Sequence, residues 1–364
     1  MRVLLLGAGG YLGRRVADRL LLDQDLQVTV LGRRDSADIR FDLSAGSPGA
    51  LARFLDAVAP QVVINCAGAT YGTPRSLVRA NTLAVATVCE AIRRSREPAR
   101  LVHVGSAAEY GPVAPGVPIP ESAEPRPVGP YGVSKLAGTE LVVSSGLDAA
   151  VLRVFDVVGP GSPAASLFGR LAEGLRRALE QNETQVRMPD LSAFRDFVDV
   201  RDVAQAIRSA AVSAATGVVN IGSGHAVRAR DAADLLVRAS GFEGALIEEA
   251  RTVVLPAQPL GEPLGQAVAV PSGVGLGLGG GLGAGSGAGF GPGLGGGSGS
   301  GLGPGPAGAV GGEPRTVGEL RTVGEPVPWR QADVRTARER LGWRAHTPLE
   351  ESLGDVWLET ACRV

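Results

Sequence analysis

The stretch RVLLLGAGGYLG, residues 2–13, decides the fold of this chain. Its apolar run predicts a short buried strand, the glycines after it predict a tight turn, and the following LGRRVADRLLL has the spacing of a helix. Glycines at this point bring backbone N–H groups close to a pyrophosphate at the start of a helix. Because the loop follows a strand and opens a helix, we predict a dinucleotide-binding loop. Its predicted cofactor-binding residues are Gly7, Gly10, Tyr11, Leu12 and Gly13.

The pattern of this first strand and helix repeats along the chain. Further short apolar runs predict strands, and the amphipathic segments between them predict helices. The predicted strands after the first are 27–31, 61–68, 100–106, 149–159 and 218–224. This alternation is typical of an α/β fold with a parallel, doubly wound sheet of the Rossmann type. We expect a smaller C-terminal substrate-binding subdomain beside it.

We divide the chain into two parts and an insertion. The NAD(P)-binding part is predicted to comprise 1–155, with 197–222 returning to it. The substrate-binding part is predicted to comprise 156–196, 223–271 and 313–364. Residues 272–312 are dominated by Gly and bury too little apolar area to offset the entropy of ordering, which predicts a disordered insertion. A helix with a packed LGW end is expected over 327–343.

The composition argues against several classes of protein. The chain has 36 basic and 37 acidic residues, and no run of Lys or Arg is interleaved with aromatic residues, so we expect no nucleic-acid partner. Three scattered cysteines are too few for a disulfide framework or a zinc site, which predicts free thiols, no metal and a cytoplasmic protein. No apolar stretch is long enough to span a bilayer, so no membrane association is expected.

The end of the second predicted strand favours NADP(H) as the cofactor. A NAD-binding protein usually has an acid there for the ribose 2′-hydroxyl, whereas this chain has Arg33 and Arg34. Arginine suits a 2′-phosphate because its hydrogen bonds to phosphate are charge-assisted. Two alternatives stay open, a solvated basic loop at this point and NAD(H) as the cofactor. The other predicted cofactor contacts are Asp42 and Leu43 at the adenine edge, and the small residues Ala67 and Gly68.

Three residues form a candidate catalytic site. Tyr131 and Lys135 lie four positions apart at the start of a predicted helix, so their side chains share one face. An ammonium near a phenol favours the phenolate, so we expect Lys135 to lower the pKa of Tyr131. Ser106, at the carboxyl end of a predicted parallel strand, is placed to donate a hydrogen bond to the same substrate oxygen. This arrangement predicts proton transfer to or from a substrate oxygen.

Taken together, these motifs resemble the extended short-chain dehydrogenases/reductases, the NAD-dependent epimerase/dehydratase family, over about 1–250 and 327–358. The motifs that carry the resemblance include GAGGYLG, NCAG, GSAAEYG, PYGVSK, FRDFVDVRDVA and VNIGSG. GSAAEYG followed by PYGVSK is most similar to the nucleotide-sugar 4-ketoreductases, such as the GDP-4-keto-6-deoxymannose reductases and the deoxysugar 4-ketoreductases of antibiotic pathways. The resemblance implies a catalytic triad of Ser106, Tyr131 and Lys135, which also contact the cofactor or substrate, and a cofactor-binding role for Asn81.

The resemblance also marks the substrate side of the site. The 4,6-dehydratases of this family carry an Asp-Glu pair after the catalytic hydroxyl, whereas this chain has Ala107 and Ala108, which argues against elimination of water. Asp156 replaces a family Asn that touches the nucleotide-sugar, and an acid there is expected to repel a diphosphate. The predicted substrate-binding residues are Ser106, Ala107, Asp156 and Arg195. For Arg195 a surface ion pair with Asp196 or Asp199 is an alternative, and Glu109 is expected to be an exposed loop acid rather than a catalytic one.

These observations favour NADPH-dependent reduction of the C4 ketone of a nucleotide-linked 4-keto-6-deoxyhexose. A nucleotide-sugar 4-epimerase with tightly bound NAD uses the same triad and is the nearest alternative. A non-catalytic dinucleotide-binding protein is a second, although such proteins commonly lose the Tyr or the Lys, and a polyketide ketoreductase is a third. We expect the partners to be a nucleotide-sugar substrate and a second copy of the chain in a homodimer.

Overall fold

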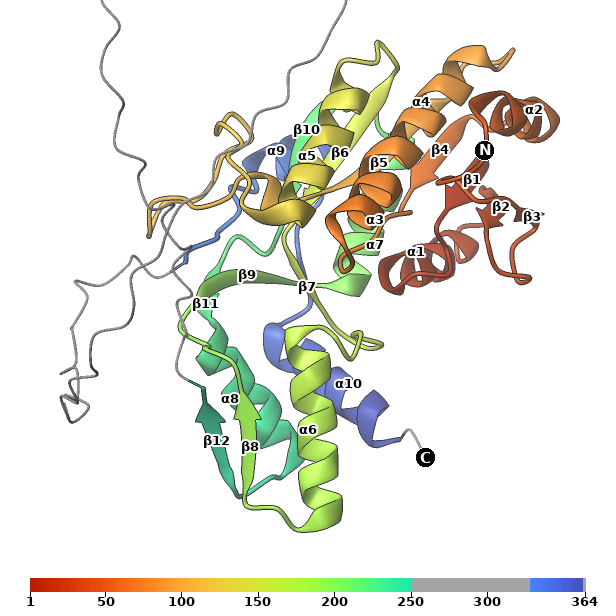
Figure 1. Cartoon of the computed structure of the whole chain (residues 1–364). Coiled ribbons are helices and arrows are strands. Elements are labelled where there is room, and N and C mark those ends of the chain that lie inside the picture. Colours follow the sequence, from red (N-terminus) through yellow and green to blue (C-terminus); the bar gives the residue numbers. More distant parts are fainter. Residues whose placement is uncertain (250–327, 363–364) are drawn as a thin grey trace, which may run out of the picture. The chain divides into compact units, whose positions relative to one another are not determined.

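A seven-stranded parallel sheet runs through the computed structural model, which describes residues 1–249 and 328–362 (Figure 1). The strand order is β10-β6-β5-β4-β1-β2-β3, so the direction of winding reverses between β1 and β4. The strands are β1 (Arg2–Leu6), β2 (Gln27–Gly32), β3 (Ile39–Arg40), β4 (Val62–Asn65), β5 (Arg100–Ser106), β6 (Ala149–Val154) and β10 (Gly217–Ile221). The predicted Rossmann-type, doubly wound sheet is confirmed. The insertion predicted at 272–312 lies outside the described residues.

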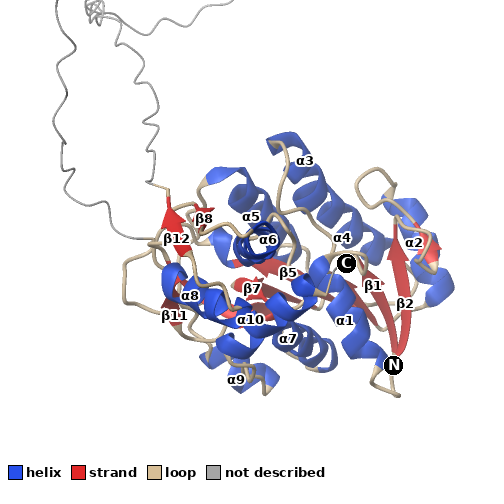
Figure 2. Cartoon of the chain, turned by 90° about the horizontal axis from the view of Figure 1, so that it is seen from below, coloured by secondary structure: helices blue, strands red, loops and turns tan. Residues whose placement is uncertain are grey.

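Helices cover both faces of this sheet, as the view from below shows (Figure 2). One face carries α1 and α7, and the other carries α2, α4 and α5. These helices are α1 (Tyr11–Leu21), α2 (Pro48–Val58), α4 (Ala84–Arg94), α5 (Gly129–Val143) and α7 (Val200–Val212). Because both faces are covered, the strands must be apolar throughout, which is why Val3 to Leu6 read as one uninterrupted apolar run and are all fully buried.

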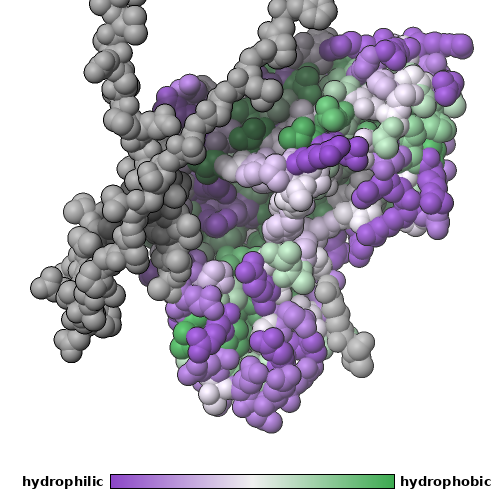
Figure 3. Space-filling model, in the orientation of Figure 1, coloured by the Kyte–Doolittle hydropathy of each residue, from purple (hydrophilic) through white to green (hydrophobic). Residues whose placement is uncertain are grey.

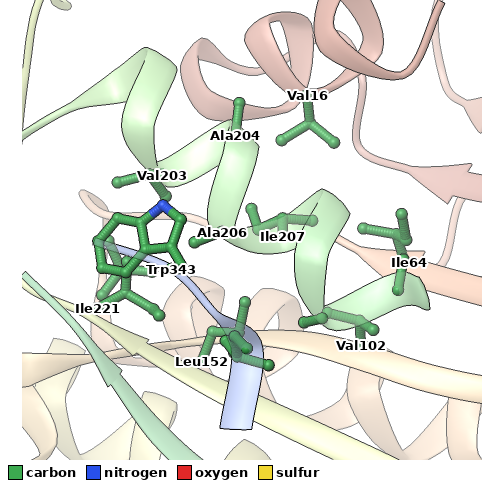
Figure 4. Packing of buried hydrophobic residues seen from close by; sticks show 14 of the residues in the cluster. Val16, Ile64, Val102, Leu152, Val203, Ala204, Ala206, Ile207, Ile221 and Trp343 are labelled. Carbon is green, nitrogen blue, oxygen red and sulfur yellow. The ribbon is translucent and has the colours of Figure 1, made fainter. Parts of the chain in front are cut away.

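The core on the α7 face draws residues from distant parts of the chain (Figure 4). Val16 of α1 faces Ala204 of α7, while Leu152 of β6 lies beneath the helix. Trp343, close to the end of the described chain, packs its ring beside Ile221 and donates its indole N–H to the carbonyl of Asp202 at 2.9 Å. The predicted packing of the LGW segment is therefore confirmed.

A second group of elements follows Val154. Its sheets have the strand orders β11-β9-β7 and β12-β8, with α6, α8 and α10 packed together beside them. The strands are β7 (Asp156–Val158), β8 (Gln185–Met188), β9 (Phe194–Asp199), β11 (Ala226–Arg228) and β12 (Ala245–Glu248). The helices are α6 (Leu167–Gln181), α8 (Ala229–Ser240) and α10 (Leu349–Ala361). The single strand predicted over 149–159 is wrong, because the chain leaves the large sheet at Phe155 and β7 pairs with β9 instead.

The returning segment, residues 328–334, is extended rather than helical. Phe194 donates its N–H to the carbonyl of Pro328, and Ile119 donates its N–H to the carbonyl of Gln331, both at 2.8 Å. These bonds to distant backbone replace those of a helix, so the helix predicted over 327–343 shortens to α9 (Arg335–Leu341). α9 contacts β10 and α7 of the large sheet, although the predicted division groups it with the substrate-binding part. That division stays a prediction.

Some apolar side chains remain at the surface of the described residues. Leu83, Val133 and Val143 are each more than half exposed, and they belong to or border α4 and α5. In the space-filling view, apolar patches lie among the polar side chains in the region of α5 (Figure 3). The homodimer stays a prediction. In the part of the chain that the structure describes, no helix combines the length and the apolar character needed to cross a membrane.

Candidate active site

The glycine loop brings β1, α1 and the end of β4 into close contact. Gly7 has φ +84°, and a Cβ there would lie 2.6 Å from the backbone nitrogen of Ala67. A Cβ at Gly13 would lie 2.1 Å from the carbonyl oxygen of Gly7. Gly10 caps the start of α1 without a side-chain hydrogen bond, and the first turn holds no acid. The loop therefore presents backbone N–H groups at a helix start, which suits an anionic group.

Beside this loop lies a cavity of about 1010 Å³. It adjoins the carboxyl ends of β1, β2 and β4, where the winding of the sheet reverses and open α/β sheets bind ligands. Its wall includes the predicted residues Gly7, Gly10, Arg33, Arg34, Asp42, Leu43, Ala67 and Gly68. Its charged residues are Arg14, Arg33, Arg34, Arg75, Arg79 and Asp42. Five arginines against one acid make the wall strongly positive, as a phosphorylated dinucleotide requires.

Arg33 and Arg34 are exposed side chains at the rim of this cavity. Arg34 folds back over the glycine loop, because its Cδ lies 3.2 Å from where a Cβ of Gly9 would be. Asp42 accepts hydrogen bonds from the Ser44 hydroxyl at 2.7 Å and from the Ser44 N–H at 2.9 Å. These bonds, with the positive charge of Arg33 nearby, hold the pKa of Asp42 below its usual value. The Asp42 carboxylate therefore stays charged beside Arg33.

Other predicted cofactor residues do not line the cavity. Asn81 is buried, and its side-chain amide donates to the carbonyl of Ala69 at 2.8 Å and to the hydroxyl of Ser134 at 3.0 Å. It lies in a π-helical turn, Arg79–Leu83, between α3 (Pro74–Val78) and α4. Asn81 thus ties the loop after β4 to α5, and its predicted cofactor contact stays a prediction. Also outside the cavity wall are Tyr11, Leu12, Gly13, Tyr131 and Lys135.

The three predicted catalytic residues come from neighbouring elements. β5 ends at Ser106, and the first two turns of α5 carry Tyr131 and Lys135. The Tyr131 side chain forms a hydrogen bond with Ser106. Lys135 is buried and donates from Nζ to the carbonyl of Val104 at 2.5 Å. The structure thus brings the phenol and the hydroxyl together, while the ammonium bonds to the backbone of β5.

The expected lowering of the pKa of Tyr131 by Lys135 is wrong in this structure. Burial raises the pKa of the Tyr131 phenol above its usual value, the hydrogen bond with Ser106 opposes that rise, and the charges of Glu109 and Asp156 add to it. Burial also lowers the pKa of Lys135, against the charge of Glu109. The Tyr131 phenol therefore keeps its proton at neutral pH.

The segment after Ser106 forms a single 3-10 turn, Ala107–Glu109. Ala107 is 2% exposed, and it offers no group that exchanges protons. Glu109 contradicts the expectation of an exposed loop acid, because it is fully buried and pairs with Arg153 at 2.8 Å. Neither a charge pattern nor a motif in the sequence links Glu109 to Arg153, which lies on β6.

Asp156 and Arg195 contact one another. Arg195 donates to one carboxylate oxygen of Asp156 at 2.8 Å, so neither Asp196 nor Asp199 is its partner in this ion pair. Arg330, from the returning segment, lies 4.0 Å from the other carboxylate oxygen. Asp156 and Arg330 both act electrostatically on Tyr131, which places this cluster beside the phenol. With two guanidinium groups around one carboxylate, the cluster is net positive, and the expected repulsion of a diphosphate by Asp156 is offset.

Four arginines near the site were not predicted from the sequence. Arg14 lines the cavity and directly follows the last glycine of the loop, so its position in the sequence could have indicated it. Arg75 and Arg79 reach the cavity from α3 and the turn after it, and no motif marks them. Arg330 reaches Asp156 only because the returning segment pairs with Phe194 and Ile119. Among the described residues, no three metal-binding side chains cluster.

Comparisons with known proteins agree with this geometry. The model of the NAD dependent epimerase/dehydratase family matches residues 3–222. A dTDP-6-deoxy-L-talose 4-dehydrogenase (NAD(P)(+)) from Kitasatospora kifunensis is 38% identical over 260 residues, covering 68% of this chain and 81% of the relative. A GDP-6-deoxy-D-mannose reductase from Pseudomonas aeruginosa is 29% identical over 204 residues, covering 52% and 66%. A UDP-glucose 4-epimerase from Azospirillum brasilense is 30% identical over 278 residues, covering 66% and 78%.

Solved structures share the fold. The structure of RMD from Pseudomonas aeruginosa complexed with NADPH has a TM-score of 0.71 and 19% identity, covering 100% of this chain and 99% of that one. MoeE5 in complex with UDP-glucuronic acid and NAD has a TM-score of 0.69 and 24% identity, covering 99% of both chains. At these identities the likeness concerns the fold alone.

Proposed function

Because the chain belongs to the NAD dependent epimerase/dehydratase family, we propose that it reduces the C4 ketone of a nucleotide-linked 4-keto-6-deoxyhexose with NADPH. The comparisons support the coarser statement, an enzyme of the epimerase/reductase type that modifies nucleotide-sugars. Chemistry at C4 fits the activity for which the relative from Kitasatospora kifunensis is named, that of a dTDP-6-deoxy-L-talose 4-dehydrogenase (NAD(P)(+)).

The residues around the glycine loop fit an NADP cofactor. Gly7 and Gly13 leave no room for a Cβ, so the backbone around them can approach a pyrophosphate closely. Arg33 and Arg34 at the cavity rim are the groups that would bind a 2′-phosphate. When bound, the nicotinamide supplies the hydride.

The observation that carries the proposal is the protonated phenol of Tyr131 beside Ser106. Burial raises its pKa, so Tyr131 holds a proton at neutral pH and can donate it to a ketone oxygen as that oxygen gains negative charge. The Ser106 hydroxyl, which lies next to the phenol, can turn its own proton to the same ketone oxygen and orient it. Lys135 lies on the same helix as Tyr131, buried, with its ammonium bonded to the carbonyl of Val104 on β5.

The groups around Tyr131 favour reduction over dehydration. Elimination of water needs an acid and a base near the sugar carbons, and Ala107 and Ala108 follow the serine instead. Glu109 is the next residue after Ala108. It is not placed to act as that acid or base, because one carboxylate oxygen accepts a hydrogen bond from Ser106 and the other accepts one from Arg153. On the substrate side, Arg195 and Arg330 supply positive charge for a diphosphate.

Steady-state assays with purified protein test the proposal. A nucleotide-linked 4-keto-6-deoxyhexose should oxidise one NADPH per sugar reduced, and an intact nucleotide-hexose should give no 4-keto-6-deoxy product. Formation of that product, or no turnover of any nucleotide-linked ketone, would contradict the assignment.

A nucleotide-sugar 4-epimerase is the second candidate, because a UDP-glucose 4-epimerase is also among the relatives. An epimerase returns its hydride to the same sugar, so it consumes no cofactor. Protein that is purified with bound NAD, and that interconverts C4 epimers without added NADPH, would favour this candidate over the reductase.

A further inference from the structure

Glu109 is a buried acid directly beneath the catalytic serine. Its side chain is 0% exposed and that of Arg153 is 4% exposed. One carboxylate oxygen accepts the backbone N–H of Ser106 at 2.8 Å, and the other accepts Nε of Arg153 at 2.8 Å. Gly105 makes this approach possible, since a Cβ there would lie 2.9 Å from the first of these oxygens.

Arg153 anchors the pair to the sheet. It lies on β6, one residue before Val154, whose Cα is the register partner of Ser106 on β5. Its guanidinium also sits 4.6 Å from the centre of the Tyr110 ring. The Tyr110 hydroxyl in turn donates to the side chain of Asn220 on β10 at 2.7 Å. The serine is therefore connected through Glu109 and Arg153 to two neighbouring strands.

Glu109 also acts on both other members of the predicted triad. Around Tyr131 the charged or titratable groups are Glu109, Asp156 and Arg330, with Ser106 as hydrogen-bond partner. Around Lys135 they are Glu109 and Cys66. Glu109 is the acid common to both sets, and its negative charge raises the pKa of the phenol and that of the ammonium.

We propose that Glu109, held by Arg153, is a positioning residue for the reaction: it orients Ser106 through the backbone N–H of that residue and places a negative charge beside Tyr131 and Lys135. The inference rests on the proposed function, in which Tyr131 donates a proton. Each oxygen of the Glu109 carboxylate already accepts a hydrogen bond, one from the backbone of Ser106 and one from Arg153, so we assign Glu109 a positioning role and no proton transfer.

The test compares Glu109→Gln with the paired variant Glu109→Gln/Arg153→Gln. The single variant leaves a buried guanidinium without its partner and will lose stability. The paired variant leaves no lone buried charge, because a neutral glutamine replaces each member of the pair. In both variants kcat should fall about tenfold or more, and the alkaline limb of kcat/KM at saturating NADPH should move to lower pH, by about half a unit to one unit.

Tyr110→Phe is the matched control, because it removes the bond to Asn220 but keeps the Glu109–Arg153 pair. Its melting temperature should fall while the alkaline limb stays where it is in the wild type. A paired variant that recovers stability and shows the wild-type kcat and pH profile would overturn the inference, since Glu109 would then be a structural residue only.

The pH dependence of NADPH binding, followed by fluorescence, gives a readout that needs no substrate. Without Glu109, Lys135 should lose its proton at a lower pH. As the pH is raised, the loss of NADPH affinity should therefore begin at a lower pH in the paired variant than in the wild type. Wild-type protein that binds NADPH but reduces no nucleotide-linked ketone would refute the proposed function alone. Identical binding profiles in the two proteins would refute the inference alone.

Discussion

Replacing Arg33 and Arg34 should remove the preference for NADPH while leaving the use of NADH intact. Both side chains line the cavity beside the glycine loop, and Arg34 lies against Gly9. Arg33→Ala and Arg34→Ala each delete one guanidinium, and the double variant deletes both. A 2′-phosphate then loses its charge-assisted partners, whereas the 2′-hydroxyl of NADH never had them.

The exposure of the two arginines sets the size of the effect. A hydrogen bond to a charged group contributes roughly 1.5–3 kcal/mol. Since both side chains are exposed and water competes for them, the lower end applies, about 1.5 kcal/mol for each. A difference of about 1.4 kcal/mol is tenfold. Each single variant should therefore lose about tenfold in kcat/KM for NADPH, and the double variant about a hundredfold.

The assay follows the oxidation of NADPH and of NADH through the near-ultraviolet absorbance of the reduced nicotinamide, which the two cofactors share. Arg40→Ala is the control, because Arg40 is an exposed arginine nearby that pairs with Asp35 and lies outside the cavity wall. It should leave both cofactors unaffected. Equal losses for NADPH and NADH in the double variant would show that the arginines support the loop and not the 2′-phosphate.

Three further outcomes are expected. Tyr131→Phe should lower kcat by about 10²–10⁴-fold with NADPH affinity nearly unchanged. Because burial raises the pKa of Tyr131, reduction by the wild type should persist until the pH exceeds the usual pKa of tyrosine, about 10. Gly13→Ala should lower stability by about 1–3 kcal/mol and abolish NADPH binding, since its Cβ would meet the Gly7 carbonyl oxygen at 2.1 Å; unchanged melting and binding would contradict this. Trp343→Ala should lower the free energy of unfolding by about 3–5 kcal/mol, measured in urea, because Trp343 is 3% exposed and bonded to Asp202.

The cofactor half of the site could be predicted because its signals are local. The glycine loop, Arg33 and Arg34 follow strands directly, and the order of strands in a doubly wound sheet brings such strand ends together. Tyr131 and Lys135 are likewise related by helical spacing. By contrast, the expected effect of Lys135 on Tyr131 is wrong, because helical spacing reveals neither that burial raises the pKa of the phenol nor that the Lys135 ammonium bonds to the carbonyl of Val104.

The sequence by itself determined the α/β class, and it located the glycine loop and the candidate residues Ser106, Tyr131 and Lys135. In each case a short stretch carries the physical constraint, a buried strand without polar positions or a turn without Cβ atoms. Only the tertiary structure decided the partners of Glu109, Asp156 and Arg330. Glu109 contacts Arg153 because β5 and β6 are adjacent. Arg330 contacts Asp156 because an extended segment returns to this part of the fold, although positions 330 and 156 are more than 170 residues apart in the sequence. Pairings at such separations depend on which strands become neighbours, and charge patterns along a chain do not record that.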